Sequence, residues 1–442
     1  MMRLSSRFLI PLLATLGATT AASAGGFDTP ILYSARHLGM GGTAVATVDD
    51  ASAGFHNPAG WGAIGRANLL ANFSPIMGSL RSSPGLYTGG TDDAGNPLVG
   101  TPINVTSETT FAPFFLLGGA VRVWDYISVG ATVFPVASAG ATYNYRTNPQ
   151  DPATEIRDYT KLVFLEIAPG VAFNYDKWGL RIGATWRINT VSLDREKTDS
   201  LDLHLKGSSL AGYRLGVQWD VPWVEGLSIG IHYRGKVKIR ADLTGDPQQA
   251  SILVPTEAHQ DWVLPARLSF GASHKVGPLR ISADAEYGFQ SQNKRGDIHI
   301  TEDEEGLVGM LPEDILARAT ANVYAWQNQW TLRGGVEYGF MKEEQLPVRL
   351  GFIWDQRTSN PAYPSAFGAP PGANYAMTAG VGYRTDGHRV NFATAYRWGN
   401  ASVTQGQLDN PDPDLGFCGF CAQPGKYVVK MAGFYLDYSY DF

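Results

Sequence analysis

The chain has 442 residues, of which 44% are hydrophobic but only 17% are charged, against roughly 25% in soluble domains. Its 12% of aromatic residues exclude a disordered chain, which lacks the side chains that bury surface. The formal net charge is -6 and the chain has no basic block, so we expect no nucleic-acid partner. Two cysteines are too few for a disulfide scaffold or a four-cysteine zinc site.

The first 24 residues have the pattern of a secretory signal peptide. Arg3 and Arg7 flank an apolar run over 8–18, and small residues end in Ala24, after which we expect cleavage. A short buried helix is the alternative. Further along, no run approaches the roughly 20 apolar residues of a membrane helix. An exported chain of this kind is either soluble or a β-barrel.

Period-two alternation distinguishes these two classes. In the last segment, the even positions from Phe434 to Phe442 are apolar, whereas Asp437, Ser439 and Asp441 alternate with them. Strands of soluble proteins average about five or six residues, but several alternating runs in this chain reach about ten. That length is typical of tilted membrane strands.

The spacing of these runs predicts an all-β fold, a transmembrane antiparallel β-barrel of about fourteen strands over 66–442. Short links alternate with long polar loops, as in outer-membrane barrels, which have short periplasmic turns and long outer loops. The predicted strands are 66–80, 109–124, 126–143, 160–176, 178–194, 205–220, 225–242, 259–276, 278–293, 328–340, 347–358, 373–385, 388–403 and 427–442.

Residues 25–65 do not fit as a barrel strand. Repeated glycines and Pro58 interrupt any alternation. An irregular segment cannot face lipid, where unpaired backbone groups are costly. Apolar residues such as Leu38, Met40 and Trp61 favour a packed segment, so we predict an N-terminal hatch that plugs the lumen. A disordered periplasmic tail is the alternative.

Nothing in the sequence indicates catalysis. Nucleophile-elbow, zinc-protease and phosphate-loop motifs are absent, and the eight histidines are scattered singly. We therefore expect no enzymatic activity, no cofactor and no metal site. Cys418 and Cys421 form a Cys-x-x-Cys motif in the last long loop, where an oxidising exterior favours a small disulfide over redox catalysis.

Three elements of the N-terminal segment resemble the hatch of the FadL family, outer-membrane transporters of long-chain fatty acids and other hydrophobic molecules such as aromatic hydrocarbons. Later stretches are similar to the family's seventh, eighth and tenth strand regions. The hatch elements are Gly39-Met40-Gly41-Gly42-Thr43-Ala44, Asp49-Asp50-Ala51-Ser52 and Asn57-Pro58-Ala59-Gly60, and the later stretches are 233–238, Leu264-Pro265 and 330–338. Outer-membrane adaptors of the PorV type begin with very similar hatch elements.

The resemblance implies a monomeric barrel in the outer membrane of a Gram-negative bacterium, with passive uptake of a fatty acid or hydrocarbon. Solute would be captured outside and released sideways into the membrane lipid near the third strand. The aromatic chain end resembles the signature that outer-membrane assembly machinery recognises, which makes Phe442 the expected contact. A secretion or assembly adaptor of the PorV type and a general porin or structural barrel are the alternatives.

Several residues are candidates for binding or gating. Asn57, Pro58, Ala59 and Gly60 form a hatch turn that we expect to shift when solute passes. The third predicted strand carries Pro135 and Gly140, and proline cannot donate to a strand ladder while glycine marks bends. A lateral gate and a tolerated bulge both fit this pattern. Arg187 is a candidate for a fatty-acid carboxylate, since arginine binds carboxylates through two hydrogen bonds.

Overall fold

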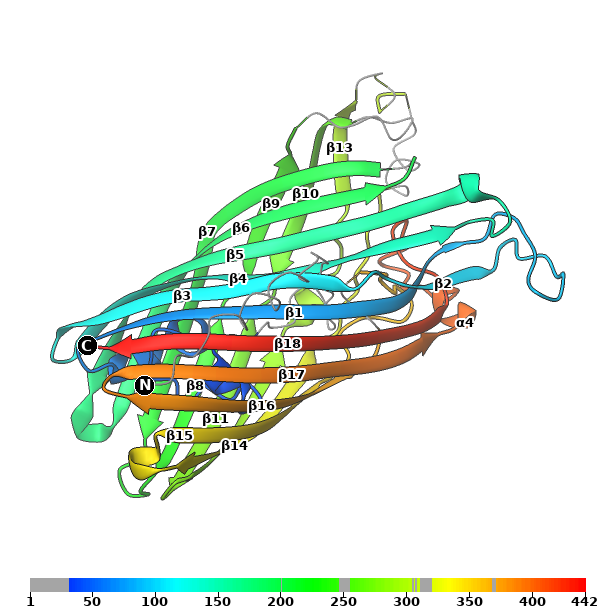
Figure 1. Ribbon diagram of the computed structural model, residues 1–442. Coiled ribbons are helices and arrows are strands. Elements are labelled where there is room, and N and C mark those ends of the chain that lie inside the picture. The colour runs from blue at the N-terminus through cyan, green and yellow to red at the C-terminus, as the bar shows by residue number, and fades with distance from the viewer. Residues whose placement is uncertain are drawn as a thin grey trace, which may run out of the picture.

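The structure, a computed structural model, describes residues 32–199, 201–245, 255–303, 306, 308–310, 320–367 and 371–442. It is all-β, with strands that wrap into a closed antiparallel barrel (Figure 1). Among the described residues, no helix combines the length and apolar character needed to cross a membrane. The predicted signal peptide, 1–24, lies outside the described residues.

Fourteen strands form the wall, as predicted. Those that run without interruption are β1 (Ala67–Leu86), β3 (Thr110–Trp124), β4 (Ile127–Arg146), β5 (Glu155–Tyr175), β6 (Leu180–Lys197), β7 (Leu201–Asp220), β14 (Gln329–Phe340), β15 (Leu346–Asp355), β16 (Asn374–Thr385), β17 (His388–Val403) and β18 (Gly425–Asp441). The others consist of two segments each: β8 (Leu227–Arg234) with β9 (Val237–Leu243), β10 (Pro255–Leu264) with β11 (Arg267–Val276), and β12 (Leu279–Gly288) with β13 (Ile298–Asp303). The short strand β2 (Pro102–Thr106) belongs to the first long loop and pairs with β1.

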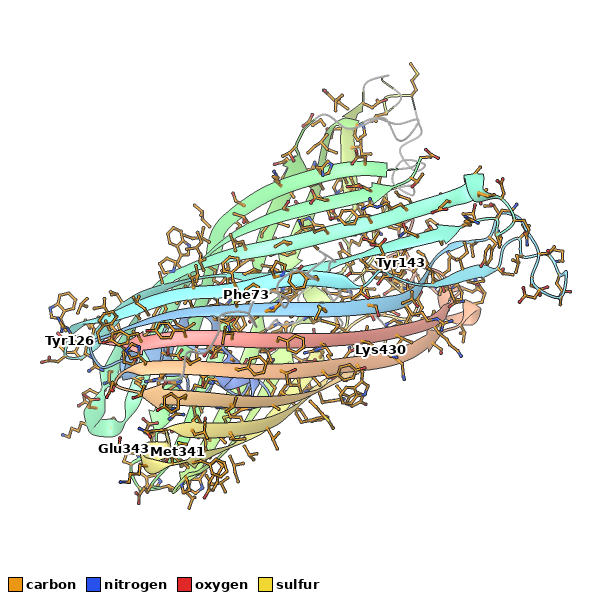
Figure 2. All side chains as sticks on the ribbon, viewed as in Figure 1. Phe73, Tyr126, Tyr143, Met341, Glu343 and Lys430 are labelled. Atoms are coloured by element: carbon orange, nitrogen blue, oxygen red, sulfur yellow. A yellow bond between two sulfur atoms is a disulfide. The ribbon has the colours of Figure 1, made fainter. Side chains whose placement is uncertain are left out.

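The barrel closes where its first and last strands meet. β1 pairs with β18 on one edge, from Asn68 with Asp441 to Arg81 with Val428, and with β3 on the other. Short turns gather at one end of the barrel and long loops at the other, here called the turn end and the loop end. Figure 2 labels Tyr126, Met341 and Glu343 at the turn end.

The segment breaks are a feature that the alternation pattern does not predict. β10 ends before Pro265, which has no N–H to give to a ladder, and β8 ends before Gly235. Several strands also extend farther towards the loop end than predicted, as in β5, which begins at Glu155 instead of 160. Both differences arise because the membrane requires only about ten residues per strand, so neither continuity nor length is fixed beyond that.

Side chains alternate between lipid and lumen. Leu436 is 52% exposed whereas its neighbour Asp437 is 1% exposed. Phe73, labelled in Figure 2, and Leu350 are other large apolar residues on the outer surface. Such a surface is unfavourable in water but matches the apolar band of a membrane barrel.

The N-terminal segment lies inside the barrel, as predicted. Its described part, 32–64, is here called the hatch and contains α1 (Ala35–Leu38), α2 (Ala53–His56) and η1 (Pro58–Ala63). Figure 1 shows it in blue behind β17 and β18, towards the turn end. The boundaries at 24/25 and 65/66 stay predictions. The remaining short helices are η2 (Pro152–Thr154), η3 (Asp176–Trp178), η4 (Gln290–Gln292), η5 (Lys342–Glu344) and α4 (Gln405–Leu408).

Candidate functional site

The hatch turn 57–60 is locked against the wall. The Asn57 side-chain amide donates hydrogen bonds to the carbonyl oxygens of Val45, at 2.7 Å, and of Val217 on β7, at 3.1 Å. Its Oδ1 accepts from the N–H of Ala59 at 3.2 Å, and Pro58 then opens η1, where its missing N–H is tolerated. Asn57 thus joins two parts of the hatch to the barrel.

Glycines on the lumen face allow the hatch backbone to approach the wall closely. A Cβ atom at Gly216 would lie 1.9 Å from Oδ1 of Asn57, and one at Gly351 would lie 2.0 Å from the backbone nitrogen of Gly41. Any side chain at these positions would have to displace the hatch. Other wall glycines that face hatch atoms in the same way are Gly183, Gly230, Gly271, Gly335 and Gly380.

Polar wall residues hold the hatch at separate points around the lumen. Asp284 on β12 accepts hydrogen bonds from the N–H groups of Ala44, at 2.9 Å, and Val45, at 3.1 Å. On the other side, Asp437 accepts from the hydroxyl of Ser34 at 2.9 Å. Within the hatch, Arg36 pairs with Asp49. Hydrogen bonds therefore dock the hatch onto the wall at several separate points.

The hydrogen-bond ladder between β3 and β4 is interrupted. Ladder pairs run from Trp124 with Ile127 to Leu117 with Val133. Beyond them, in the described stretches 110–116 and 134–141, no pair joins the two strands until the N–H of Glu108 donates to the carbonyl of Thr142 at 2.9 Å. This stretch is here called the β3–β4 break.

Pro135 and Gly140 both lie on the β4 side of the break. The pairing of β4 with β5 shifts register between Pro135 and Ala137, and residues 134–137 are all buried, so the inside–outside alternation is lost there. A Cβ at Gly140 would lie 2.4 Å from the carbonyl oxygen of Thr160 on β5. On the outer surface of the barrel, an apolar depression of about 440 Å³ borders the break on the side nearer the turn end, at Leu117, Thr132 and Val133.

An aromatic cluster connects the hatch to this break. The Tyr33 hydroxyl donates to the carbonyl oxygen of Pro135. Its ring packs against Phe55 of the hatch, with ring centroids 5.1 Å apart, and against Phe134 of β4, at 5.8 Å. The guanidinium of Arg214 lies over both phenylalanine rings.

A second cavity, here called the loop pocket, lies at the loop end. It has a volume of about 110 Å³ and its walls are mainly aromatic and aliphatic. Trp262, Tyr324 and Trp326 form one side, with centroids 6.4 Å and 5.3 Å apart along the series. Ala139, within the β3–β4 break, lines the opposite side together with Phe367. Among the described residues that line it, Arg195 is the charged one, and it is paired with Asp158.

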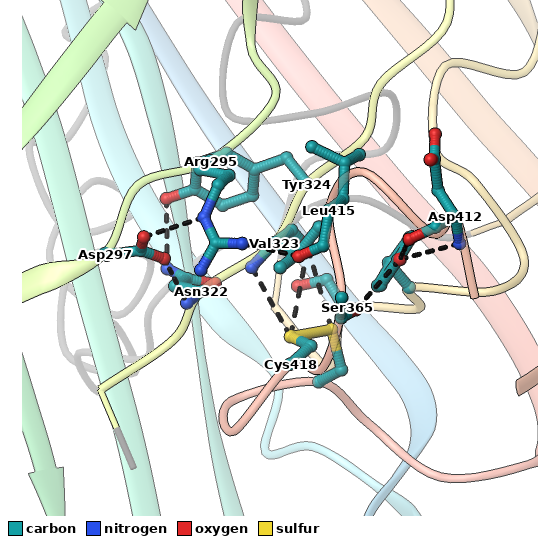
Figure 3. The surroundings of a disulfide bond; sticks show 12 residues. Arg295, Asp297, Asn322, Val323, Tyr324, Ser365, Asp412, Leu415 and Cys418 are labelled. Carbon is teal, nitrogen blue, oxygen red and sulfur yellow. Dashed lines mark hydrogen bonds and ion pairs between the residues drawn. A yellow bond between two sulfur atoms is a disulfide. The ribbon is translucent and has the colours of Figure 1, made fainter. Parts of the chain in front are cut away.

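A disulfide between Cys418 and Cys421 forms part of the roof of the loop pocket (Figure 3). The Val323 N–H donates to the sulfur of Cys418 at 3.4 Å, and the Gly419 N–H donates to the carbonyl of Ala321 at 2.8 Å. These contacts tie the loop between β17 and β18 to the segment that carries Tyr324.

The family model of outer membrane transport proteins, OMPP1/FadL/TodX, matches residues 15–442. The chain belongs to this family. FadL-family members are channels for hydrophobic substrates in the outer membrane of Gram-negative bacteria. In such barrels the short turns face the periplasm and the long loops face outwards, so the loop pocket lies on the outer side.

Solved structures show the same fold. The chain is 17% identical to a FadL homologue from Pseudomonas aeruginosa, with a TM-score of 0.65 over 94% of this chain and 100% of that one. It is 15% identical to the P. putida toluene transporter TodX, with a TM-score of 0.64 over 93% and 99%. It is 16% identical to the Ralstonia pickettii toluene transporter TbuX, with a TM-score of 0.57 over 94% of this chain and 99% of that one. A sequence comparison with curated proteins gives no match.

Arg187 is not at the loop pocket of this FadL-family barrel. Its side chain is fully buried, and its Nε donates to Glu166 at 2.8 Å while Nη1 donates to the carbonyl of Gly235 at 2.5 Å. Arg214 binds the other oxygen of Glu166 at 2.8 Å. Binding of a substrate carboxylate by Arg187 stays a prediction, and the pair with Glu166 argues against it.

The loop pocket and the lumen glycines were missed at the sequence level. A signal for the glycines exists, because Gly216, Gly335 and Gly351 occupy lumen-facing positions in the middle of strands, where a side chain would normally fill the barrel. The described pocket residues come from β4, β5, β6, β10 and β13 and from three loop segments, and no local pattern relates them. Within the described residues, no group of three potential metal ligands occurs.

Proposed function

We propose that the protein takes up hydrophobic molecules passively, either long-chain fatty acids or hydrocarbons, and releases them sideways into the outer membrane through the β3–β4 break. The observation that supports this most strongly is the position of Ala139, which lines the loop pocket and lies within the break. A solute in the pocket would therefore border directly on the stretch of wall that lacks ladder pairs.

The physical chemistry of the route favours this direction. Transfer of an apolar solute from water into an apolar environment is favourable without any energy input. The loop pocket offers the first such environment, and the depression at Leu117 and Val133 opens on the lipid side. For a solute to pass from the loop pocket to this depression, only small apolar side chains such as Val136, Ala137 and Ala139 have to move aside.

The hatch turn 57–60 and the two strand residues Pro135 and Gly140 have separate roles in this proposal. The turn shifts to widen the lumen next to the hatch. Pro135 and Gly140 prevent β4 from forming a continuous hydrogen-bond ladder with β3. The barrel acts as a monomer, reaches the outer membrane after cleavage of residues 1–24, and is inserted by assembly machinery that contacts Phe442.

Pocket size bears on the substrate class. An apolar cavity of about 150 Å³ binds benzene, and the loop pocket has about 110 Å³. A compact aromatic hydrocarbon therefore fits it better than a whole long alkyl chain, for which the break and the depression would have to hold the remainder. Two of the structural neighbours are described as toluene transporters.

The test is uptake by Gram-negative cells that carry this protein as their only hydrophobic-solute channel. Ala139→Trp fills the passage between pocket and break, and we expect it to abolish uptake of an alkylbenzene and of a long-chain fatty acid. Ala376→Trp is the matched control, because Ala376 is an equally buried small residue on β16 that lines neither cavity. Heat-modifiable gel mobility confirms insertion of both variants.

Normal uptake by an inserted Ala139→Trp protein would contradict the route. Failure of the unmodified protein to move any hydrophobic solute would contradict transport itself. If that protein also co-purified with a secretion complex, the adaptor function would replace it.

A further inference from the structure

Three basic side chains lie on the outer surface of the barrel, in the half near the loop end. Lys426 and Lys430 belong to β18 and Arg81 belongs to the neighbouring strand β1, and all three are exposed. Figure 2 shows Lys430 on β18, farther from the turn end than Phe73 on β1. These three residues are here called the basic patch.

The strand register brings the three side chains of the basic patch together. Val428, which lies between the two lysines on the same face of β18, is the direct partner of Arg81, and Lys430 is the direct partner of Ser79. Arg81 is therefore a diagonal neighbour of Lys430. Diagonal neighbours on one face of a sheet are about 7–8 Å apart, which is within the reach of long side chains. Lys426 flanks Val428 on its other side, so the three positive groups converge on one area.

The basic patch has no acidic partner among the residues that the structure describes. Its side chains take part in no ion pair, and the outward positions beside them on β1, β3 and β17 carry no aspartate or glutamate. Elsewhere on the outer surface of the loop end, Arg157 pairs with Glu196 at 2.6 Å and Arg240 pairs with Asp242 at 3.0 Å. The basic patch is therefore a positively charged area on a surface whose other arginines are neutralised by neighbours.

Aromatic residues place the basic patch at the edge of the membrane. Trp398 of β17 is the direct partner of Lys430, and its ring centroid lies 5.9 Å from those of Tyr375 and Tyr396. Tryptophan and tyrosine collect where a membrane meets water. From Lys430 to Tyr438, near the turn end, β18 contains nine residues, and a tilted strand crosses the apolar core with about 9–11 residues. Because the long loops face outwards, the patch lies at the level of the outer headgroups.

We propose that the basic patch binds the phosphate of a phosphorylated lipid in the outer leaflet of the outer membrane. Lysine and arginine at a membrane surface attract anionic headgroups. Arginine holds a phosphate through two parallel hydrogen bonds, and lysine adds a compact positive charge.

The apolar surface next to the patch favours a lipid over free phosphate. Water and salt screen exposed charges, so an exposed patch binds a small ion weakly by charge alone. A lipid adds contacts of its acyl chains with the outer surface of the same two strands, where Phe73 and Phe434 are 49% and 40% exposed. β1 also pairs with β3, so the bound lipid lies one strand away from the β3–β4 break. The binding itself does not depend on transport of any solute.

Native mass spectrometry of the full-length protein in a non-ionic detergent tests the site. The probe is lipid A, a glycolipid with two phosphate groups, and the comparison is the same lipid after removal of both phosphates. EDTA is present so that divalent cations do not bridge the lipid to acidic residues. We expect one saturable adduct with lipid A and at least about tenfold weaker binding of the phosphate-free form. Equal binding of the two forms would overturn the proposal.

Two triple variants locate the effect, and each removes three positive charges from the outer surface of the loop end. The patch variant combines Arg81→Gln, Lys426→Gln and Lys430→Gln, and the control variant combines Arg157→Gln, Lys161→Gln and Arg240→Gln. The control removes two ion-paired arginines and a lysine that lies opposite Asp194. We expect the patch variant to bind lipid A at least about tenfold more weakly and the control to bind it as the unmodified protein does.

Equal losses in the two triple variants would show that only the net charge matters, and would overturn the site. If the patch variant does not insert, Lys430→Gln alone is compared with Lys161→Gln. The same criterion applies to this pair: weaker binding by Lys430→Gln alone supports the site, and equal binding overturns it.

Inorganic phosphate distinguishes a lipid site from a general anion site. The unfolding midpoint is followed by heat-modifiable mobility, and lipid A should raise it by a few degrees in the unmodified protein. Sodium phosphate at matched ionic strength should leave the midpoint unchanged. An equal rise with sodium phosphate that is lost in the patch variant would mean that the patch takes a free anion, and would overturn the lipid assignment. Uptake plays no part in these measurements, so the lipid site and the proposed transport route stand or fall separately.

Discussion

The Tyr33 hydroxyl donates a 2.5 Å hydrogen bond to the carbonyl oxygen of Pro135, across 102 positions of sequence. Tyr33 belongs to the hatch, and Pro135 is the residue at which the β4–β5 register shifts within the β3–β4 break. The hatch and the break are therefore in direct contact, so that movement of one changes the surroundings of the other.

Loss of this hydrogen bond should loosen the hatch. Tyr33→Phe keeps the ring but leaves a buried carbonyl without its donor, which costs about 1–3 kcal/mol. We expect faster amide hydrogen exchange over 32–64 in an inserted barrel. Tyr143→Phe is the control. Tyr143 lies on β4, as Pro135 does, and its hydroxyl donates a 2.6 Å hydrogen bond to the carbonyl oxygen of Ala366 in a loop away from the hatch. Equal exchange in both variants would argue against the coupling.

Acid should also loosen the hatch. Burial, with a further contribution from Arg36, lowers the pKa of His37 to about 3, whereas an unfolded histidine has a pKa near 6.5. Between these values the released hatch binds a proton that the docked hatch does not, so docking weakens as pH falls from about 6.5 towards 3. For His37 the loss is about 2 kcal/mol at pH 5.

Asp49 acts in the same direction, because Arg36 and Arg389 hold its pKa below the usual range although the side chain is partly buried. Its contribution is lost only as pH falls below about 4, so the buried hatch histidines dominate at pH 5: His37, and His56, whose pKa is also lowered well below its usual value by burial. Single-channel conductance should therefore rise from pH 7.5 to pH 5, and His37→Asn should reduce this rise. An identical rise in His37→Asn would show that His37 is not the titrating group.

Opposite faces of β15 should respond differently to substitution. Leu350 is 59% exposed to the lipid side, and Leu350→Arg should destabilise the barrel by about 2–4 kcal/mol if it lies near the bilayer midplane. Gly351→Ala should instead displace Gly41 and raise ion conductance, with little effect on folding into lipid vesicles. The inside–outside assignment would be wrong if both variants had the same effect on folding and conductance.

The disulfide should set the affinity of the loop pocket. The disulfide closes a very short loop, so its loss removes a conformational restraint worth about 2 kcal/mol from the segment 418–421, which lines the loop pocket through Cys421. In the double variant Cys418→Ser with Cys421→Ser we expect a several-fold weaker binding of N-phenyl-1-naphthylamine, measured by its fluorescence. A reductant should reproduce this in the unmodified protein and have no effect on the variant. Unchanged affinity in both experiments would exclude the disulfide from the site.

Local patterns predicted those parts of the fold that the membrane dictates. The alternation of Leu436 with Asp437 gave the lipid and lumen faces correctly, and the glycines and Pro58 placed the N-terminal segment inside the barrel. Pro135 was singled out because it cannot donate to a ladder, and the structure places it at the β3–β4 break.

Contacts between distant parts of the sequence could not be predicted in this way. The pairing of Arg187 with Glu166 depends on the relative register of β5 and β6. Alternation does not determine this register, because a shift of one strand by two residues leaves the same side chains on the lumen face. The loop pocket likewise depends on how long loops fold over the barrel, as in the contact of Cys418 with Val323.

The most direct test of the proposed route is the order in which a solute that enters the protein from outside reaches the membrane bilayer and the vesicle interior. Outer-membrane vesicles that carry the protein are loaded with serum albumin, and their phospholipid is brominated so that it quenches a fluorescent aromatic hydrocarbon. Sideways release predicts that quenching in the bilayer precedes transfer to albumin, and that Ala139→Trp slows the quenching. Transfer to the enclosed albumin before any quenching would mean that solute passes straight through the barrel and would contradict the account.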